Sequence, residues 1–239
     1  MTEPITAADY LQQQIGRGTR LRAARGSSPA AAADRELLRR WQAGRLERTH
    51  KDFLEDPRYR PAAEFFLTDI YGTGDTTRRD EEIERAYPLM IRTMPDRALR
   101  SIGAAFELDA LTETLDEQLL AALSRSNLNV AALDERTYAQ AFRACDNYDL
   151  RTRQIDLIAK LGGELSRLVA KPLLARTLRA MRLPARVAGY GTLQSFLERG
   201  FEAFRRMPDA RMFVDTVEAR ERRILDRIYA KDPDPFRTS

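Results

Sequence analysis

The sequence predicts an all-α protein, an irregular bundle of about eight to ten helices without a β-sheet. Apolar residues recur at helical spacings along most of the 239 residues. Residues that cap helices, and prolines that begin or end them, stand at the ends of those apolar patterns. β-branched residues are sparse, and no segment alternates apolar and polar residues for as long as a half-buried strand requires.

The N-terminal region is predicted to contain a short helix and a flexible basic arm. The helix covers residues 7–15, with a threonine before it as its cap. Residues 16–28 follow, with three glycines and four arginines that no acidic residue opposes. Because glycine weakens a helix, this composition favours a flexible segment. We therefore expect an N-terminal unit over residues 1–28 and a single all-helical domain over residues 29–239.

Serine and proline positions predict the helices that follow. Ser28 and Pro29 suit the cap and the first turn of a long helix that reaches about Glu55. Pro88 lies inside a later helix, where its ring predicts a kink or a break. Further helices are expected over residues 96–123, over 134–144, over 150–171, from Pro172, from Pro184 and over 209–230.

The stretch from Pro61 to Tyr71 is predicted to form a helix that is apolar nearly all round, which is typical of a helix at the centre of a fold. It carries two carboxylates, Glu64 and Asp69, that an α-helix would point to different sides. Since buried charges are nearly always paired, we expect Asp69 to pair with an arginine or a helix end and Glu64 to be half-exposed. The aromatic helix is then the buried hub of the bundle.

The turn after this helix is the second candidate site. Its glycines, threonines and arginines precede a helix N-terminus, as in a phosphate-binding loop, but the Gly-Lys-Ser/Thr ending of a P-loop is missing. Acidic residues in the first turn of the next helix favour ordinary capping, although they could also form half of a magnesium-binding motif. The candidate ligand-binding residues are therefore Glu64, Asp69, Tyr71, Arg78 and Asp80.

Charge is strongly segregated along the chain. The net charge is +4, and only four of the 40 basic residues are lysines. With abundant alanine and leucine, this skew toward arginine is typical of a bacterial genome with GC-rich codons. Residues 52–85 and 106–135 are acidic on balance, whereas residues 143–186 are strongly basic. The pattern indicates either complementary packing of helices or a docking face for an acidic partner.

Two residue counts restrict the chemistry. Cys145 is the only cysteine, which excludes an intrachain disulfide, and His50 is the only histidine. Zinc enzymes and di-iron bundles need more imidazoles, so we expect no metal site and no cofactor. Nothing in the local sequence favours a nucleophilic pair between Cys145 and His50. No apolar run approaches the roughly 20 residues of a membrane span, and no secretory signal is evident, so a cytoplasmic location is expected.

These features favour a non-enzymatic bacterial cytoplasmic protein that acts by binding another protein or by self-association. The alternative is a ligand-binding protein whose site is lined by carboxylates and arginines, or a magnesium-dependent enzyme that processes phosphates. Nucleic acid is a weaker partner class. The basic arm over residues 16–28 leaves it open, but the arginines there are not interleaved with aromatic residues.

Overall fold

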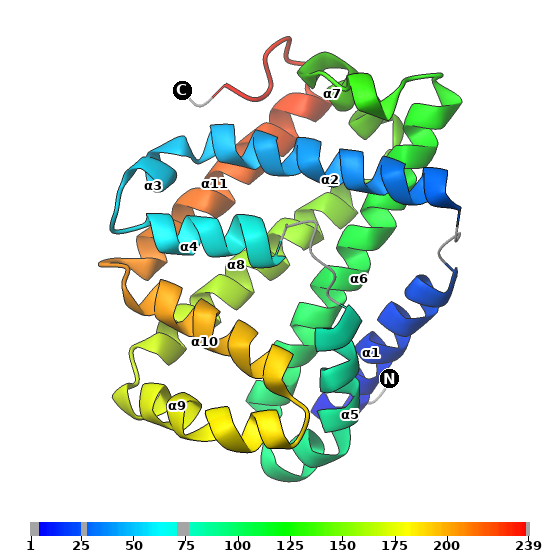
Figure 1. Ribbon diagram of the computed structural model, residues 1–239. Coiled ribbons are helices and arrows are strands. Elements are labelled where there is room, and N and C mark those ends of the chain that lie inside the picture. Colours follow the sequence, from blue (N-terminus) through cyan, green and yellow to red (C-terminus); the bar gives the residue numbers. More distant parts are fainter. Residues whose placement is uncertain (1–4, 25–27, 71–76, 238–239) are drawn as a thin grey trace.

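The computed structural model describes residues 5–24, 28–70 and 77–237, which are helical and contain no β-strand (Figure 1). The all-α prediction is thus confirmed for the described residues. None of their helices is both long and apolar enough to cross a bilayer. In chain order the elements are α1 (Ala7–Ala24), α2 (Pro29–Thr49), α3 (Lys51–Glu55), α4 (Arg60–Phe65), the π-helical η1 (Phe66–Ile70), α5 (Thr77–Thr93), α6 (Asp96–Arg125), the 3-10 helix η2 (Val130–Ala132), α7 (Glu135–Ala144), α8 (Tyr148–Val169), α9 (Pro172–Val187), α10 (Gly191–Arg205) and α11 (Ala210–Tyr229).

The long helix α6 is the central element of the bundle. It runs along the molecule between α1 and α8 (Figure 1). Its apolar side chains enter three buried clusters, with α1 and α5 at one end, with α8 in the middle, and with α2, α7 and α11 at the other end. Leu115 and Leu119, near the middle of the last two clusters, are fully buried. Because it contributes to three buried clusters, α6 is the helix at the centre of the bundle.

The aromatic segment packs on the side of the bundle, so its predicted role as the hub is wrong. The ring of Phe66 lies 5.8 Å from that of Phe204 in α10. At Gly200 the two elements approach so closely that a Cβ atom would lie 2.8 Å from the ring of Phe65. Glu64 is exposed to solvent. The segment therefore fills one cluster, shared with α3, α10 and α11.

The N-terminal helix is longer than predicted. It continues from Ala7 to Ala24, so the expected flexible arm is wrong for residues 16–24. The packing against α6 explains why the glycines are tolerated: Gly18 is buried, and a Cβ atom at Gly103 of α6 would lie 2.7 Å from the ring of Tyr10. Residues 25–27 lie outside the described part, and the division of the chain at residue 28 stays a prediction.

Two prolines do not interrupt their helices. α5 continues through Pro88, where a kink or a break was predicted, so the break does not occur. α9 continues through Pro184, where a new helix was predicted to start. Both prolines are exposed. The backbone carbonyl that each one leaves without an N–H partner can therefore be hydrated, which lowers the cost of continuing the helix. The break that does occur is at His50, which separates α2 from α3.

Predicted helix caps are confirmed at the described ends. Ser28 accepts a hydrogen bond from the N–H of Ala31, with Pro29 in the first turn of α2. Asp134 forms a capping box with Thr137 at the start of α7. Local capping chemistry therefore determines these two helix starts.

Candidate functional site

A groove of about 600 Å³ lies between the α4–η1 segment, α9 and α10. Glu64 and Asp69, both predicted as ligand-binding residues, lie on its α4–η1 wall. The prediction that they point to different sides is wrong, because residues 66–70 form a π-helical turn. Residues five apart lie one turn apart in a π-helix, whereas an α-helix would rotate them away from each other.

The two predicted carboxylates differ in their partners. Asp69 accepts hydrogen bonds from Arg199 of α10, whose Nε lies 3.0 Å from Oδ1, and from Thr68, whose Oγ1 lies 3.0 Å from Oδ2. The expected pairing of Asp69 with an arginine is therefore confirmed. The carboxylate of Glu64 is exposed and makes no hydrogen bond to the described residues. A ligand in the groove would meet Glu64 as an available charge and Asp69 as part of the wall.

The other three predicted site residues cannot be added to this groove. Tyr71, and the turn over residues 72–76, lie outside the described residues. Arg78 and Asp80 fall in the first turns of α5, but their side chains lie outside the described part. Their role stays a prediction.

Two acidic residues of α5, Glu82 and Glu84, serve packing of the helices. Glu82 is 1% exposed, and its carboxylate accepts hydrogen bonds from the backbone N–H groups of Thr192 and Leu193, at 3.3 and 2.7 Å. It therefore caps the N-terminus of α10, where a negative charge is favourable. Glu84 pairs with Arg22 of α1 at 2.7 Å. The described residues contain no group of three or more potential metal-ligating side chains.

The charges on the α10 wall of the groove are mostly used within the chain. Glu198 pairs with Arg182 of α9 at 2.7 Å, and Glu202 pairs with Arg206 at 3.0 Å. Arg179 of α9 also lines the groove, but it forms no ion pair with the described residues. The groove thus offers an incoming molecule few uncommitted charges, and Arg179 stands at its border with the outer face of α9.

The helix α9 has an exposed apolar stripe. Leu173, Leu183 and Val187 are 72%, 71% and 81% exposed. Together with the exposed Ala180 they are seven, three and four residues apart along the helix. This heptad-like spacing aligns them on one face, as in the seam of a coiled coil. In Figure 1, α9 lies at the edge of the molecule, below α10.

Only a thin contact holds α9 on the body of the protein. Ala185 is its one buried residue among the side chains that are described. Gln194 of α10 donates a hydrogen bond to the carbonyl of Leu178 at 2.7 Å, and Arg85 of α5 donates one to the carbonyl of Gly189 at 3.0 Å. Such a helix buries little of its own apolar surface, so its outer face is available to another molecule.

The basic segment over residues 143–186 divides into two parts. Its first part is used for packing: Arg143 donates to the carbonyl of Ile228, and Arg153 pairs with Glu107 at 2.8 Å. In α9, by contrast, Arg176 and Arg179 form no ion pair with the described residues. α9 carries four arginines and no acidic residue. Complementary packing of helices, one of the two predicted uses of the charge segregation, is therefore present, and the docking face for an acidic partner stays a prediction.

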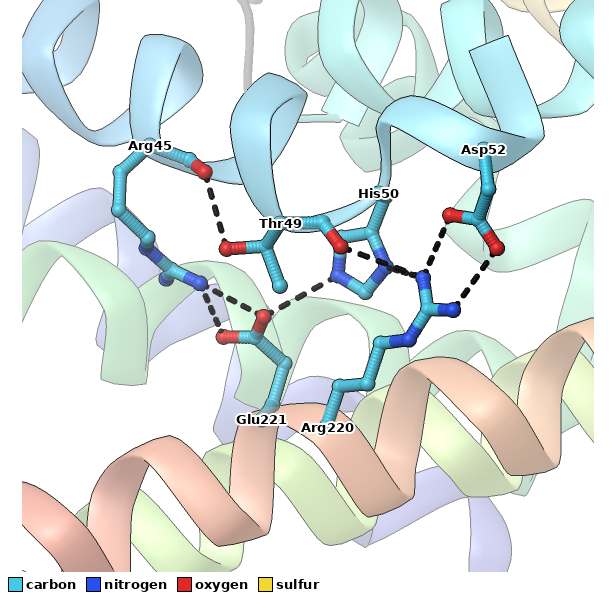
Figure 2. A network of polar contacts seen from close by, with 6 residues as sticks. All are labelled: Arg45, Thr49, His50, Asp52, Arg220 and Glu221. Atoms are coloured by element: carbon cyan, nitrogen blue, oxygen red, sulfur yellow. Dashed lines mark hydrogen bonds and ion pairs between the residues drawn. The ribbon is translucent and has the colours of Figure 1, made fainter. Parts of the chain in front are cut away.

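A second polar constellation, not predicted from sequence, joins the α2–α3 break to α11 (Figure 2). Nη1 of Arg45 lies 2.6 Å from each of the two carboxylate oxygens of Glu221. Nε2 of His50 lies 3.1 Å from Glu221 Oε1. Arg220, which precedes Glu221 in α11, donates to both carboxylate oxygens of Asp52, at 2.7 and 2.8 Å. The only histidine is thus part of an ion-pair network and has no partner role with Cys145, whose Sγ donates to a backbone carbonyl of its own helix.

The environment of Glu221 keeps its carboxylate charged. Burial alone raises its pKa, but the charge of Arg45 and the hydrogen bond with His50 outweigh burial and lower the pKa to about 2. Arg220 Nη1 lies 3.5 Å from His50 Nδ1. Because a guanidinium N–H can only donate, this contact suits the tautomer of His50 that carries its hydrogen on Nε2.

The family model described as "Domain of unknown function (DUF8198)" matches residues 21–235 of the chain. Because the match covers far more than half of the sequence, the chain belongs to this family. No curated protein and no solved structure matches the chain.

Proposed function

We propose that this member of the DUF8198 family acts by binding an acidic, amphipathic helix of a partner protein along α9. The observation that carries the proposal is the exposed stripe of Leu173, Ala180, Leu183 and Val187. Arg176 lies within this stripe and Arg179 beside it, and neither forms an ion pair with the described residues. A partner helix with apolar residues at heptad spacing would cover the stripe. Acidic side chains beside that apolar face would meet Arg176 and Arg179.

Charge favours this partner over a second copy of the chain. A symmetric dimer that paired α9 with α9 would bring Arg176 and Arg179 of one copy close to those of the other. Like charges across an interface are costly, whereas complementary charges speed association and select the partner.

An acidic membrane surface fits α9 less well than a partner helix. The sequence of α9 contains no aromatic residue that could anchor it at the lipid headgroups. The groove beside it carries the exposed carboxylate of Glu64, which an anionic membrane would repel. A small molecule in the groove is also less favoured, because its carboxylates Asp69 and Glu198 are already paired with arginines.

The test uses a defined probe, a fluorescent amphipathic peptide with leucines at heptad positions and glutamates elsewhere. Its affinity for the purified protein is measured by fluorescence anisotropy at low and at high salt. We expect saturable binding that weakens with salt, because exposed charges are screened. Replacing both Arg176→Glu and Arg179→Glu should weaken binding by more than about tenfold.

A matched control carries the same change in net charge elsewhere. Arg40→Glu with Arg211→Glu reverses two exposed arginines outside α9, each paired only within its own helix. This variant should bind the peptide like the unaltered protein. Equal loss of binding in both variants would show that the net charge alone attracts the peptide. Binding to vesicles rich in phosphatidylserine in place of the peptide, or a dimer that the α9 substitutions dissociate, would also overturn the proposal.

A further inference from the structure

A cavity of about 80 Å³ lies in the interior, where α2, α6, α7, α8 and α11 meet. Its lining combines apolar side chains with charged and polar ones. The charged residues are Arg45, Asp116, Arg151 and Glu221. The space exceeds the roughly 30 Å³ that one water molecule occupies in the liquid, so it is large enough for a compact ion.

The guanidinium of Arg151 is deeply buried and under-partnered. The residue is 5% exposed, and the one hydrogen bond of its side chain to the described residues runs from Nη2 to the carbonyl of Leu115, at 3.3 Å. Its Nε has no hydrogen-bond partner in the described part of the chain. The ring of Phe142 lies 4.3 Å from the guanidinium carbon and gives a cation–π contact. A buried cation ordinarily needs a charged or strongly polar partner as well.

Asp116 lies on the same cavity but does not provide that partner directly. It is 6% exposed and accepts a hydrogen bond from Gln42 at Oδ1, at 3.0 Å. No ion pair within 4.0 Å joins it to Arg151 in the described structure. Burial raises its pKa, against the lowering effects of the Gln42 hydrogen bond and the Arg151 charge. Glu221 is already held by Arg45 and His50, so its charge is balanced (Figure 2).

We propose that the cavity binds a compact inorganic anion, of the size of chloride or nitrate, between Arg151 and Asp116, and that Asp116 takes up a proton from solvent on binding. The anion accepts hydrogen bonds from Arg151 and from the protonated Oδ2 of Asp116. With Glu221 balanced by Arg45, the remaining charge at the site is that of Arg151. One monovalent anion neutralises it when Asp116 carries a proton.

The groups around Asp116 come from every helix packed against it. Arg35 and Arg39 face it from α2, Glu113 and Glu117 from α6, Tyr138 from α7 and Arg151 from α8. Arg35, Arg39 and Asp116 also line a smaller cavity of about 30 Å³. Asp116 therefore stands between the two spaces, and the arginines of α2 favour the approach of an anion from that side.

The proposal is tested through thermal stability at constant ionic strength. Sodium gluconate, whose anion is too large for the cavity, is replaced stepwise by sodium nitrate or chloride. We expect Tm to rise and saturate with the small anions. The apparent Kd should fall by up to about tenfold for each pH unit of acidification while Asp116 is ionised, because one proton is taken up with each anion. Asp116→Asn should bind the anion with little dependence on pH.

Arg151→Met should abolish the effect of the small anions. If this variant fails to fold, the anomalous signal of bromide in crystals of the unaltered protein decides, since a peak is expected between Arg151 and Asp116. The surface variant Arg176→Glu with Arg179→Glu should keep the effect, which separates this site from the exposed arginines of α9. Equal Tm values in gluconate, chloride and nitrate, or crystals without a bromide peak in the cavity, would mean that water alone fills it and would overturn the proposal.

Discussion

The arginines of the α2–α11 contact differ from those of α9 in burial and in ion pairing. Arg45 and Arg220 lie partly or fully inside the bundle and pair with carboxylates at 2.6 and 2.7 Å. Arg176 and Arg179 lie on an exposed helix without ion pairs among the described residues. The same residue type therefore stabilises the fold in one region, while in the other it is free to determine which molecules approach.

The difference follows from burial. A buried charge must keep its partner, because removing the partner leaves an ion in a low-dielectric interior. An exposed charge is solvated with or without a partner, so its contribution to folding is small. Substitutions in the α2–α11 contact should accordingly lower the free energy of unfolding, whereas substitutions on the outer face of α9 should change binding and leave that free energy nearly unaltered.

The largest effect is expected at Glu221. Glu221→Gln removes the charge that balances Arg45 in the interior, so the free energy of unfolding should fall by about 3 kcal/mol or more. Urea denaturation followed by circular dichroism measures it. Glu218→Gln on the same helix is the control, since Glu218 pairs with Arg222 at a half-exposed position. A cost below about 1 kcal/mol at Glu221, equal to that of an exposed pair, would remove the distinction between the two regions.

The free energy of unfolding should also depend on pH through the carboxylate of Glu221. The pKa of Glu221 is about 2 in the folded protein, below its ordinary value of 4.5. The ionised carboxylate thus contributes stability above pH 4.5, and this contribution is lost as the pH falls toward 2. Its size is about 3 kcal/mol, since each pKa unit corresponds to about 1.4 kcal/mol. Asp116, whose pKa is raised, acts with the opposite sign, so stability is lost there as the pH rises through its folded pKa.

Comparing the unaltered protein with Glu221→Gln isolates this contribution. Denaturation curves between pH 6 and pH 2 should converge as the pH falls, because the variant lacks the carboxylate that titrates. Parallel curves would contradict the lowered pKa of Glu221.

Two neighbouring glycines test the same contrast between packed and open positions, with the next largest expected changes in the free energy of unfolding. Gly162 and Gly163 are neighbours in α8, but a Cβ atom at Gly162 would lie 2.7 Å from Val214 of α11, whereas nothing lies within 4 Å of one at Gly163. Gly162→Ala should destabilise the protein by about 1–3 kcal/mol through overpacking. Gly163→Ala should stabilise it by up to about 1 kcal/mol, because alanine is the better helix former. Thermal unfolding distinguishes the two signs, and the same sign for both would contradict the packing.

Local chemistry made part of this architecture predictable from sequence. Caps such as Ser28 and Asp134 determine helix starts through hydrogen bonds within a few residues, so their spacing can be recognised directly. The pairing of Asp69 with an arginine follows from the cost of an unpaired buried charge, although its partner, Arg199, lies 130 residues away.

The errors arose where distant contacts overrode local preference. α6 stabilises the glycine-containing end of α1, and hydration of exposed carbonyls permits Pro88 and Pro184 inside helices. The break predicted at Pro184 hid the α9 stripe, because a helix that started there would separate Leu183 from Val187. The His50–Glu221 contact joins residues 171 positions apart, and no local pattern in the sequence announces it.

The smallest effect on stability is expected on the outer face of α9. Leu183→Ser with Val187→Ser should change the free energy of unfolding by less than about 0.5 kcal/mol, since both side chains are already solvated. Leu178→Ser, on the face that packs against α10, is the control and should cost about 1–3 kcal/mol. Urea denaturation gives both values, and the acidic peptide should lose affinity only for the double variant. A large stability cost for the double variant would mean that the stripe is covered within the chain, and α9 could not then be the surface that receives a partner helix.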